Sequence, residues 1–474
     1  MSRTVTIDPV TRLEGHGKIT IMLDDAGAVE NAHFHVTQVR GFERFSQGRP
    51  YYEMPSLMAR VCGICPVSHL LASAKACEAI MSVRIPHTAA QLRRVLNLAQ
   101  LLQSHALSFF YLASPDLLLG MESDPATRNV LGVAAATPVL GRAGVALRRI
   151  GQTIIELLSG KRIHTGWVVP GGVTEPLTGE KRDSILAMLP EAMRDTQMAL
   201  AAYKQIAGQF KQEIEVFANF GSNYLGMVDG DGSAVYTDGN LRLIDQAGYT
   251  IEDDISAIRF TQVIGEAVEP YSFTKFPYYK PLGYPEGCYR VGPLARLNIV
   301  SNMGTEHADK ELKEFKQLSH RPVESSFHYH HARLVEMLYA IEMIEMILAD
   351  PKILDKHVRA AAGVNRQEGA GQAEAPRGVL HHHYKVDDNG KIVWANLMIA
   401  TGHNNRAMNL GVTQAARAYV KKGKFTEGAL NRIQAVVRTF DPCLSCSTHA
   451  FGQMPLKVEL VSSDGEVVDR VVQG

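Results

Sequence analysis

The first 40 residues alternate between hydrophobic and polar positions, the period expected for β-strands. Candidate strands cover residues 5–7, 18–23 and 32–39, and Asp24-Asp25-Ala26-Gly27 is the turn between two of them. From Pro55 onward the apolar residues follow a helical spacing. The amino-terminal region is therefore predicted to form a small sheet that precedes a helical body.

Long segments in the middle of the chain carry the helical pattern. Apolar residues recur every three or four positions over 88–113, 142–159, 183–219 and 328–349, with few internal breakers. A final helix is expected at about 405–421, before the last cysteines. These segments predict a central bundle of long helices.

Two regions interrupt this pattern. Residues 221–300 are rich in Gly, Pro, Tyr and Asp and contain short strands, which indicates an insertion on the helical body. The small residues of 364–376 predict a loop, with strands after it at 385–386 and 392–399. The predicted fold class is α+β, with small sheets contributed by the amino- and carboxy-terminal regions. The expected divisions are a β region (1–54), a helical bundle (55–220), an irregular α/β insertion (221–300), a second region of helices with a β segment (301–449) and a carboxy-terminal peptide (450–474).

Composition places the chain among ordinary globular proteins. It is 46% hydrophobic and 21% charged, with a formal net charge of zero. This balance gives no reason to expect nucleic acid or an anionic membrane as partner. No apolar run is long enough to span a bilayer, and the first residues lack a secretory signal. The sequence therefore predicts a cytoplasmic protein without a transmembrane segment.

Four of the six cysteines form two CxxC pairs near opposite ends of the chain, in RVCGICPVSH and DPCLSCSTH. Two such pairs supply a soft ligand set that selects zinc, iron–sulfur or nickel centres over calcium or magnesium. If Cys62, Cys65, Cys443 and Cys446 share a metal, the fold must bring the two ends together. Cys77 and Cys288 stand alone and are interpreted as core residues.

Spacing alone leaves three alternatives open for the pairs: a structural zinc site, a redox-active CxxC and a catalytic metal. Structural zinc pairs are usually separated by a few tens of residues, whereas almost the whole chain lies between these two. Asp441, Arg60 and His449 flank the cysteines and are candidates to orient ligands or move protons.

At these residues the sequence closely resembles the large subunit of nickel–iron hydrogenases. Five motifs follow in the family's order and extend over nearly the full length: DPVTRLEGH (8–16), RGFE (40–43), RVCGICPVSH (60–69), EAPRG (374–378) and DPCLSCSTH (441–449). Three further pieces resemble the bidirectional, NAD-reducing group: SHALSFFYLASPD (104–116), YRVGPLARLN (289–298) and HHHYKVD (381–387).

The resemblance implies reversible heterolytic cleavage of H2 at a nickel–iron centre. Cys62 and Cys443 would be terminal nickel ligands, while Cys65 and Cys446 would also bridge to an iron that carries CO and cyanide. Thr401 would contact a cyanide, although the family often has Pro-Ser where this chain has Ala-Thr.

Further roles follow from the same resemblance. Glu14 would be the first proton carrier, and Arg377 would lie above the metals. Asp116 and Asp441 would hold that arginine in place. The remaining expected neighbours of the cofactor are His69, near a bridging sulfur, and Pro376.

A second, hard ion of the magnesium type is also implied. Glu43, His449 and the carbonyl of Leu397 would bind it, since oxygen donors suit such an ion. The histidines at 328–331 and 381–383 are given no metal, because neighbouring side chains there point to different faces.

The carboxy-terminal residues imply processing. Members of the family are clipped after the histidine of DPCxxCxxH, here between His449 and Ala450, so residues 450–474 would be a maturation peptide and the chain the precursor form. A maturation endopeptidase and nickel-insertion chaperones are therefore expected partners.

The expected electron partners are separate polypeptides. Cys77 and Cys288 cannot bind an iron–sulfur cluster alone, and no dinucleotide fingerprint is present. A small iron–sulfur subunit, together with a flavin-bearing diaphorase, is expected to carry electrons to NAD+. The alternatives are a deazaflavin- or methyl-viologen-linked hydrogenase, a silent quinone-linked relative and a structural zinc scaffold.

Overall fold

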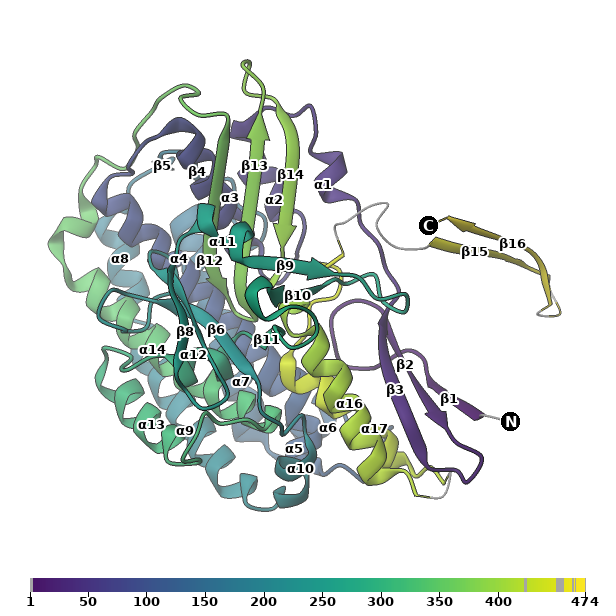
Figure 1. Cartoon of the computed structure of the whole chain (residues 1–474). Coiled ribbons are helices and arrows are strands. Elements are labelled where there is room, and N and C mark those ends of the chain that lie inside the picture. The colour runs from purple at the N-terminus through teal and green to yellow at the C-terminus, as the bar shows by residue number, and fades with distance from the viewer. Residues whose placement is uncertain (1–2, 422–423, 449–455, 463, 465, 474) are drawn as a thin grey trace.

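The chain folds around a bundle of long helices, flanked by several small sheets (Figure 1). The structure, a computed structural model, describes residues 3–421, 424–448, 456–462, 464 and 466–473. The bundle consists of α4 (His87–Ala106), α7 (Pro138–Ser159), α9 (Leu189–Ala207) and α14 (Tyr329–Ala349), which pack on one another. The expected α+β class is confirmed.

Shorter helices surround the bundle or connect its members. Their bounds are α1 Phe42–Phe45, η1 Tyr51–Glu53, α2 Met54–Ala59, α3 Pro66–Met81, the π-helix η2 Leu107–Ala113, α5 Ser114–Leu119, α6 Val130–Ala136, α8 Gly179–Leu186, α10 Lys211–Val216, α11 Ala257–Val263, η3 Lys280–Leu282, α12 Pro293–Ile299, α13 Glu306–Lys316, η4 Ser326–His328, η5 Pro351–Leu354, α15 Ala400–His403, α16 Asn405–Tyr419 and α17 Glu427–Phe440.

The strands form small, mostly antiparallel sheets. These are β1 Arg3–Ile7, β2 Gly17–Leu23 and β3 Val29–Val36 in one sheet; β11 Tyr289–Arg290, β6 Asn223–Val228, β7 Asn240–Ile244 and β8 Thr250–Ile255 in that order in a second; and β12 Glu368–Ala375, β13 Gly378–Val386 and β14 Ile392–Met398 in a third. Two-stranded pairs are β4 Val168–Val169 with β5 Gly172–Val173, β9 Ile264–Ala267 with β10 Phe276–Tyr279, and β15 Leu456–Val461 with β16 Val467–Gln473.

Two helix predictions need correction. The segment 183–219 is three helices rather than one, because Pro190 occupies the first turn of α9 and Gly208 follows its end. A further helix, α17, lies between α16 and the second cysteine pair. Its apolar positions, from Ala429 to Phe440, have helical spacing, and Thr426 caps its first turn by accepting from the N–H of Ala429 (3.1 Å).

The predicted loop at 364–376 is wrong over most of its length, since β12 occupies residues 368–375 and is buried. Its small residues serve packing against α3. A Cβ on Gly369 would lie 2.3 Å from the carbonyl oxygen of Ala76, and one on Gly371 would lie 2.2 Å from that of Ala72. Glycine is required here because a helix backbone approaches a strand directly.

The two ends of the chain meet beside the bundle. Residue Glu14 forms a parallel β-bridge with Cys443, and the N–H of Arg40 donates to the carbonyl of Thr448 (2.7 Å). Helix α16 packs on β3, and Figure 1 shows these segments side by side. The β15–β16 hairpin projects from this side of the body.

No helix among the described residues has the length and apolar character needed to cross a bilayer. The division into five regions is not tested by the fold and stays a prediction.

Candidate metal centre

Four buried thiols from opposite ends of the chain converge on one point. Cys62 and Cys65 lie between α2 and α3, and Cys443 and Cys446 follow α17. All four sulfurs lie within 4.8 Å of one another. Neighbouring Sγ atoms are 3.1 Å apart for Cys62–Cys65, 3.9 Å for Cys65–Cys446, 2.7 Å for Cys446–Cys443 and 3.5 Å for Cys443–Cys62.

This arrangement fits a shared metal ion. Four thiolates each about 2.3 Å from one ion would have neighbouring sulfurs roughly 3.2–3.8 Å apart. The Cys443–Cys62 distance lies in this range, the 3.1 and 3.9 Å distances lie just outside it, and the Cys446–Cys443 distance of 2.7 Å is shorter. Among the described residues, this is the one group of three or more His, Cys, Asp or Glu side chains with metal-binding geometry. The spatial convergence expected from the two CxxC pairs is therefore present.

The thiols do not share one protonation behaviour. Hydrogen bonds from Cys443, Cys446 and Cys62 hold the pKa of Cys65 well below its usual value, although burial opposes this. Burial raises the pKa of Cys443 and of Cys446 well above the usual value. A metal that binds all four as thiolates must therefore displace protons.

Glu14 lies beside the second cysteine pair. Its carboxylate accepts from the N–H of Ser445 (3.1 Å) and from the Ser445 hydroxyl, and its carbonyl accepts from the N–H of Leu444 (3.1 Å). Gly15 follows with a left-handed φ of 87°, and a Cβ there would lie 2.8 Å from the Cβ of Leu444. The loop is thus fixed against the segment that carries Cys443 and Cys446.

Arg377 is buried above the same segment and faces Asp441. Its Nη2 lies 3.0 Å from a carboxylate oxygen of Asp441, and its Nε donates to the Asp441 carbonyl. The 3.0 Å contact lacks hydrogen-bond geometry, so both Nη atoms and both carboxylate oxygens have no hydrogen-bond partner. Burial alone would lower the pKa of Arg377. The charges of Asp441 and of the thiols of Cys443, Cys65 and Cys62 outweigh burial and raise this pKa well above its usual value, so the guanidinium stays charged.

Buried polar groups rarely lack hydrogen bonds, so the two Nη atoms of Arg377, which have no hydrogen-bond partner, fit a further polar group at the thiol cluster. Thr401 lies there too, and its hydroxyl accepts from the N–H of Cys443 (2.9 Å). His69 contacts His382 (3.3 Å between ring nitrogens) and contributes weakly to lowering the pKa of Cys65. Pro376 is buried next to Arg377.

Asp116 is not where the resemblance predicted. Its buried carboxylate contacts Arg12 (2.5 Å), Arg438 (2.9 Å) and Arg128 (3.7 Å). Among the described residues, Asp116 forms no ion pair with Arg377, which pairs with Asp441 instead. Of the two acidic residues expected to hold Arg377, only Asp441 contacts it.

A second, smaller site surrounds Glu43. Its carboxylate accepts from the N–H of Leu397 (2.8 Å), and burial raises its pKa despite the nearby Lys275. Glu266 lines the same cavity of about 10 Å³ and pairs with Lys275 (2.9 Å). A cavity of that size holds about one water-sized species. His449, the other expected ligand, lies outside the described residues, as does Ala450.

The isolated cysteines and the histidine clusters do not join the centre. Cys77 is buried, as predicted, and donates to the carbonyl of Tyr51 (3.1 Å). Cys288 is only half-buried and lines a surface pocket, so its interpretation as a core residue is wrong. The histidines at 328–331 and 381–383 lie outside the group of described residues that has metal-binding geometry.

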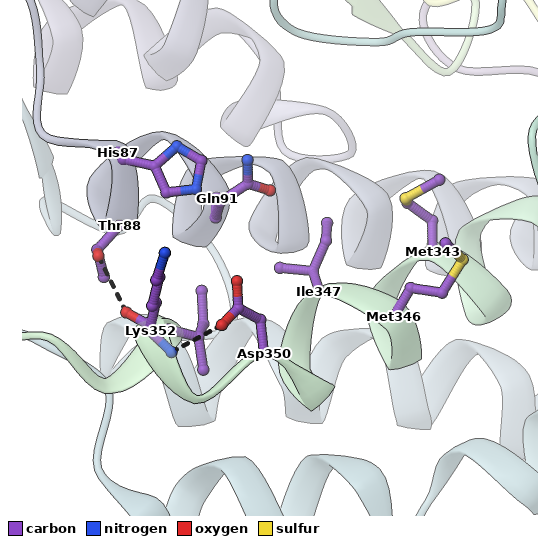
Figure 2. Close-up of a pocket in the computed structure, with 9 residues that line it drawn as sticks. His87, Thr88, Gln91, Met343, Met346, Ile347, Asp350 and Lys352 are labelled. Carbon is purple, nitrogen blue, oxygen red and sulfur yellow. Dashed lines mark hydrogen bonds between the residues drawn. The ribbon is translucent and has the colours of Figure 1, made fainter.

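A separate hollow of about 240 Å³ lies between the start of α4 and the end of α14. Figure 2 shows the residues that line it. His87 and Gln91 lie on one side, with Asp350 and Lys352 on the other. Met343 lines this hollow, and Arg333 lies on the same helix, α14, on the side of the thiols. Met343 is ten positions beyond Arg333, which is about 15 Å along the helix. Arg333 lies near Asp441, so this hollow is remote from the thiols.

Sequence reasoning missed three contributors to the site. Ser445 holds Glu14, Lys275 neutralises Glu266, and Arg333 donates to the carbonyl of Thr439 (2.7 Å). Ser445 lies inside a quoted motif, so its position was an available signal. Lys275 and Arg333 lie in none of these motifs. Thr439, the partner of Arg333, is also 106 positions away, whereas Glu266 is 9 positions from Lys275.

Comparison with known proteins agrees with this geometry. A family model described as nickel-dependent hydrogenase matches residues 40–127 and 233–449, and one described as HoxL-like matches residues 4–39. The chain is 40% identical to one component of the F420-non-reducing hydrogenase vhc of Methanococcus voltae, over 95% of this chain and 96% of that protein. It is 39% identical to the beta component of the NAD-reducing hydrogenase HoxS of Cupriavidus necator, over 99% of each.

Solved structures give the same result. An NAD+-reducing [NiFe]-hydrogenase in its H2-reduced state superposes with a TM-score of 0.92 at 44% identity, over 94% of this chain and 99% of that one. The Ni-Fe-Se hydrogenase of D. vulgaris Hildenborough has a TM-score of 0.76 at 24% identity, which shows a shared fold.

Proposed function

Because this chain belongs to the nickel-dependent hydrogenase family as a large subunit, we propose that it cleaves H2 heterolytically and reversibly at a nickel–iron centre. The convergence of four buried thiols beside an arginine whose Nη atoms have no hydrogen-bond partner carries the proposal. Nickel with an iron that carries CO and cyanide would supply the redox chemistry and the H2-binding site. Cys62 and Cys443 would bind nickel alone, and Cys65 and Cys446 would bridge to iron.

The residues above the thiols would stabilise charge. Arg377 is a fixed cation in a buried setting, where electrostatic interactions are stronger than in water. Asp441 orients it through the contacts described above. Thr401, already bonded to the N–H of Cys443, and the neighbouring Pro376 would line the diatomic ligands of the iron.

Glu14 would carry the proton away from the centre. Thiolates are basic enough to accept a proton when H2 is split, and a carboxylate nearby can receive it. The bonds from Ser445, which precedes Cys446, hold the Glu14 carboxylate next to the thiol segment. His69 would adjust the basicity of Cys65.

The cavity at Glu43 would hold a magnesium-type ion. Two carboxylates, those of Glu43 and Glu266, face a space for about one small species, and oxygen donors suit a hard cation. The carbonyl of Leu397 and the side chain of His449 would complete the set. Lys275 would balance the charge of Glu266.

Electrons would leave through partner proteins in the cytoplasm. Only Cys77 and Cys288 remain once the centre is formed, and they are too few for an iron–sulfur cluster. We expect a small iron–sulfur subunit, together with a flavin-bearing diaphorase that reduces NAD+. The HoxS relative named for NAD is 39% identical and the vhc relative named F420-non-reducing is 40% identical, so a different acceptor is the second candidate.

Maturation would end with cleavage between His449 and Ala450, which removes residues 450–474. A maturation endopeptidase and nickel-insertion chaperones would act before that step. The intact mass of the active enzyme should lack this peptide, and an active, metal-replete enzyme that retains it contradicts the proposal.

Metal analysis of the natively co-expressed complex tests the function. We expect about one nickel and one extra iron per large subunit, both lost in Cys443→Ser and both kept in a Cys77→Ser control. Zinc alone, with no nickel, would support a structural scaffold and overturn the proposal.

A further inference from the structure

Asp116 is a buried carboxylate at a junction of four segments, although it does not touch Arg377. It lies in α5 and is 3% exposed. Its two oxygens accept from Arg12 of the amino-terminal loop and from Arg438 and Asn431 of α17, and one oxygen lies 3.7 Å from Arg128. A buried charge with this many partners fixes the relative positions of the segments that supply them.

The contacts converge on the residues just before Glu14. Arg12 also donates to the carbonyl of Leu112 (2.8 Å). Arg438, held by Asp116, donates through Nε to the carbonyl of Thr11 (2.9 Å) and through Nη2 to its hydroxyl (3.2 Å). Asp116 therefore holds the side chain of Arg12 directly, and it holds the backbone of Thr11 through Arg438.

The loop needs such an anchor because its backbone is strained. Arg12 adopts a left-handed φ of 58°, a backbone conformation that is unfavourable for a residue with a Cβ. Two residues later, Glu14 is bonded to Ser445 on the other side. Arg438 lies at the end of α17, which leads directly into the segment of Cys443 and Cys446. Asp116 thus joins the loop that carries Glu14 to the helix that leads to the second cysteine pair.

We propose that Asp116 is a positioning residue for proton transfer, which holds Glu14 at the thiol cluster through Arg12 and Arg438. The inference rests on the proposed role of Glu14. Asp116 touches neither the thiols nor Glu14, so its effect must pass through the loop at residues 11–14.

The test compares Asp116→Asn with Glu213→Gln in the natively assembled complex. Asparagine keeps the shape of Asp116 but presents an amide N–H to arginine donors. Glu213 is a matched control, because its buried carboxylate pairs with Arg432 on α17 (2.7 Å) and does not contact the loop. Arg12→Gln is a second variant that breaks the link at a less buried residue and leaves Asp116 bonded to Arg438.

We expect Asp116→Asn and Arg12→Gln to keep full metal content and unchanged infrared bands of the iron ligands. The kcat for H2 oxidation should fall about 10- to 100-fold with little change in KM, because a displaced proton carrier slows the step it serves. The solvent deuterium isotope effect should rise as proton transfer becomes limiting. Glu213→Gln should change neither kcat nor the isotope effect.

A double variant separates the two proposals. In a Glu14→Gln background, Asp116→Asn should cause no further loss of the residual rate. A normal rate in metal-replete Asp116→Asn beside an inactive Glu14→Gln overturns this inference alone. Loss of activity only in proportion to lost metal also overturns it. A normal rate in Glu14→Gln refutes the proton-carrier role and, with it, the present inference.

Discussion

At the residue scale, the side chains around the thiols divide into those that contact the centre and those that hold its neighbours. Arg377 and Asp441 belong to the first group, since the Nη atoms of Arg377 and the carboxylate oxygens of Asp441 have no hydrogen-bond partner near the sulfurs. Asp116 and Ser445 belong to the second, because they act on Glu14 or its loop. Substitutions in the first group should therefore change the properties of the metal centre. Substitutions in the second group should slow proton transfer and leave the metals in place.

Glu14→Gln should abolish most H2 turnover while leaving the metals in place. The amide keeps the hydrogen bond from the N–H of Ser445 but cannot accept a proton, and losing a positioned acid–base group typically costs about 10²–10⁴-fold in rate. The assay is H2 oxidation together with nickel and iron content. Glu30→Gln, an exposed residue of β3, is the control. Loss of metal in Glu14→Gln would show a structural role instead.

The sequence identified the residues of the centre but not all of their partners. The motifs identify the four cysteines, Glu14 and Arg377, because each of these residue types serves one kind of chemistry at its motif position. The motif match for Asp116 did not indicate which arginine its carboxylate contacts. The structure places three arginines other than Arg377 around it. Contacts between residues hundreds of positions apart depend on the fold, so residue type alone cannot assign them.

At the element scale, α3 and β12 set the position of the first cysteine pair. Cys65 immediately precedes α3, and the glycines of β12 allow the strand to lie directly against that helix. The strand was predicted as a loop because its small residues resemble a linker in composition. The helices were predicted more successfully, since their periodicity is local and extends over several turns.

Gly371→Ala should destabilise the chain and reduce metal retention. The added Cβ would lie 2.2 Å from the carbonyl of Ala72, and relieving such overpacking costs about 1–3 kcal/mol. The thermal midpoint of the complex and its nickel content should both fall. Gly179→Ala, at the first position of α8 with open space around it, should leave both unchanged. Equal behaviour of the two variants would contradict close packing of β12 on α3.

Helix α14 stabilises the opposite side of the site through a buried charge network. Glu336 accepts from Arg296 at 2.6 and 2.7 Å, and Arg296 donates to the carbonyls of Ala375 and Pro376, next to Arg377. Burial would raise the pKa of Glu336, but Arg296 and His105 hold it at about 2. Burial lowers the pKa of His105 to about 4, so at neutral pH this histidine is an uncharged donor to Glu336 rather than an ion-pair partner.

This network predicts the acid sensitivity of the fold. The folded-state pKa of Glu336 lies below its usual 4.5, so its contribution to stability is complete above pH 4.5 and is lost as the pH falls toward 2. The fold holds His105 neutral, because burial lowers its pKa from 6.5 to about 4. Folding stability therefore declines further as the pH falls from 6.5 to 4. Glu336→Gln should lower the thermal midpoint at pH 7, because Arg296 loses one of its two carboxylate partners and keeps only Glu374. The same variant should show a smaller further decline below pH 4.5. Parallel pH profiles of wild type and variant would contradict this.

At the scale of the whole molecule, the fold brings the first and last parts of the described body together around the thiols. Glu14 bridges to Cys443, Arg40 bonds to Thr448, and α16 covers β3. No local pattern in the sequence predicts these pairings. They were anticipated only through the hypothesis that two distant CxxC pairs share one metal, which made the meeting of the ends a condition for function.

The infrared spectrum of the natively co-expressed complex tests the central claim most directly. If the four thiols hold nickel and an iron that carries CO and cyanide, the spectrum contains one CO band and cyanide bands that are absent from Cys446→Ser and present in Cys77→Ser. A metal-replete complex without such bands would contradict the account.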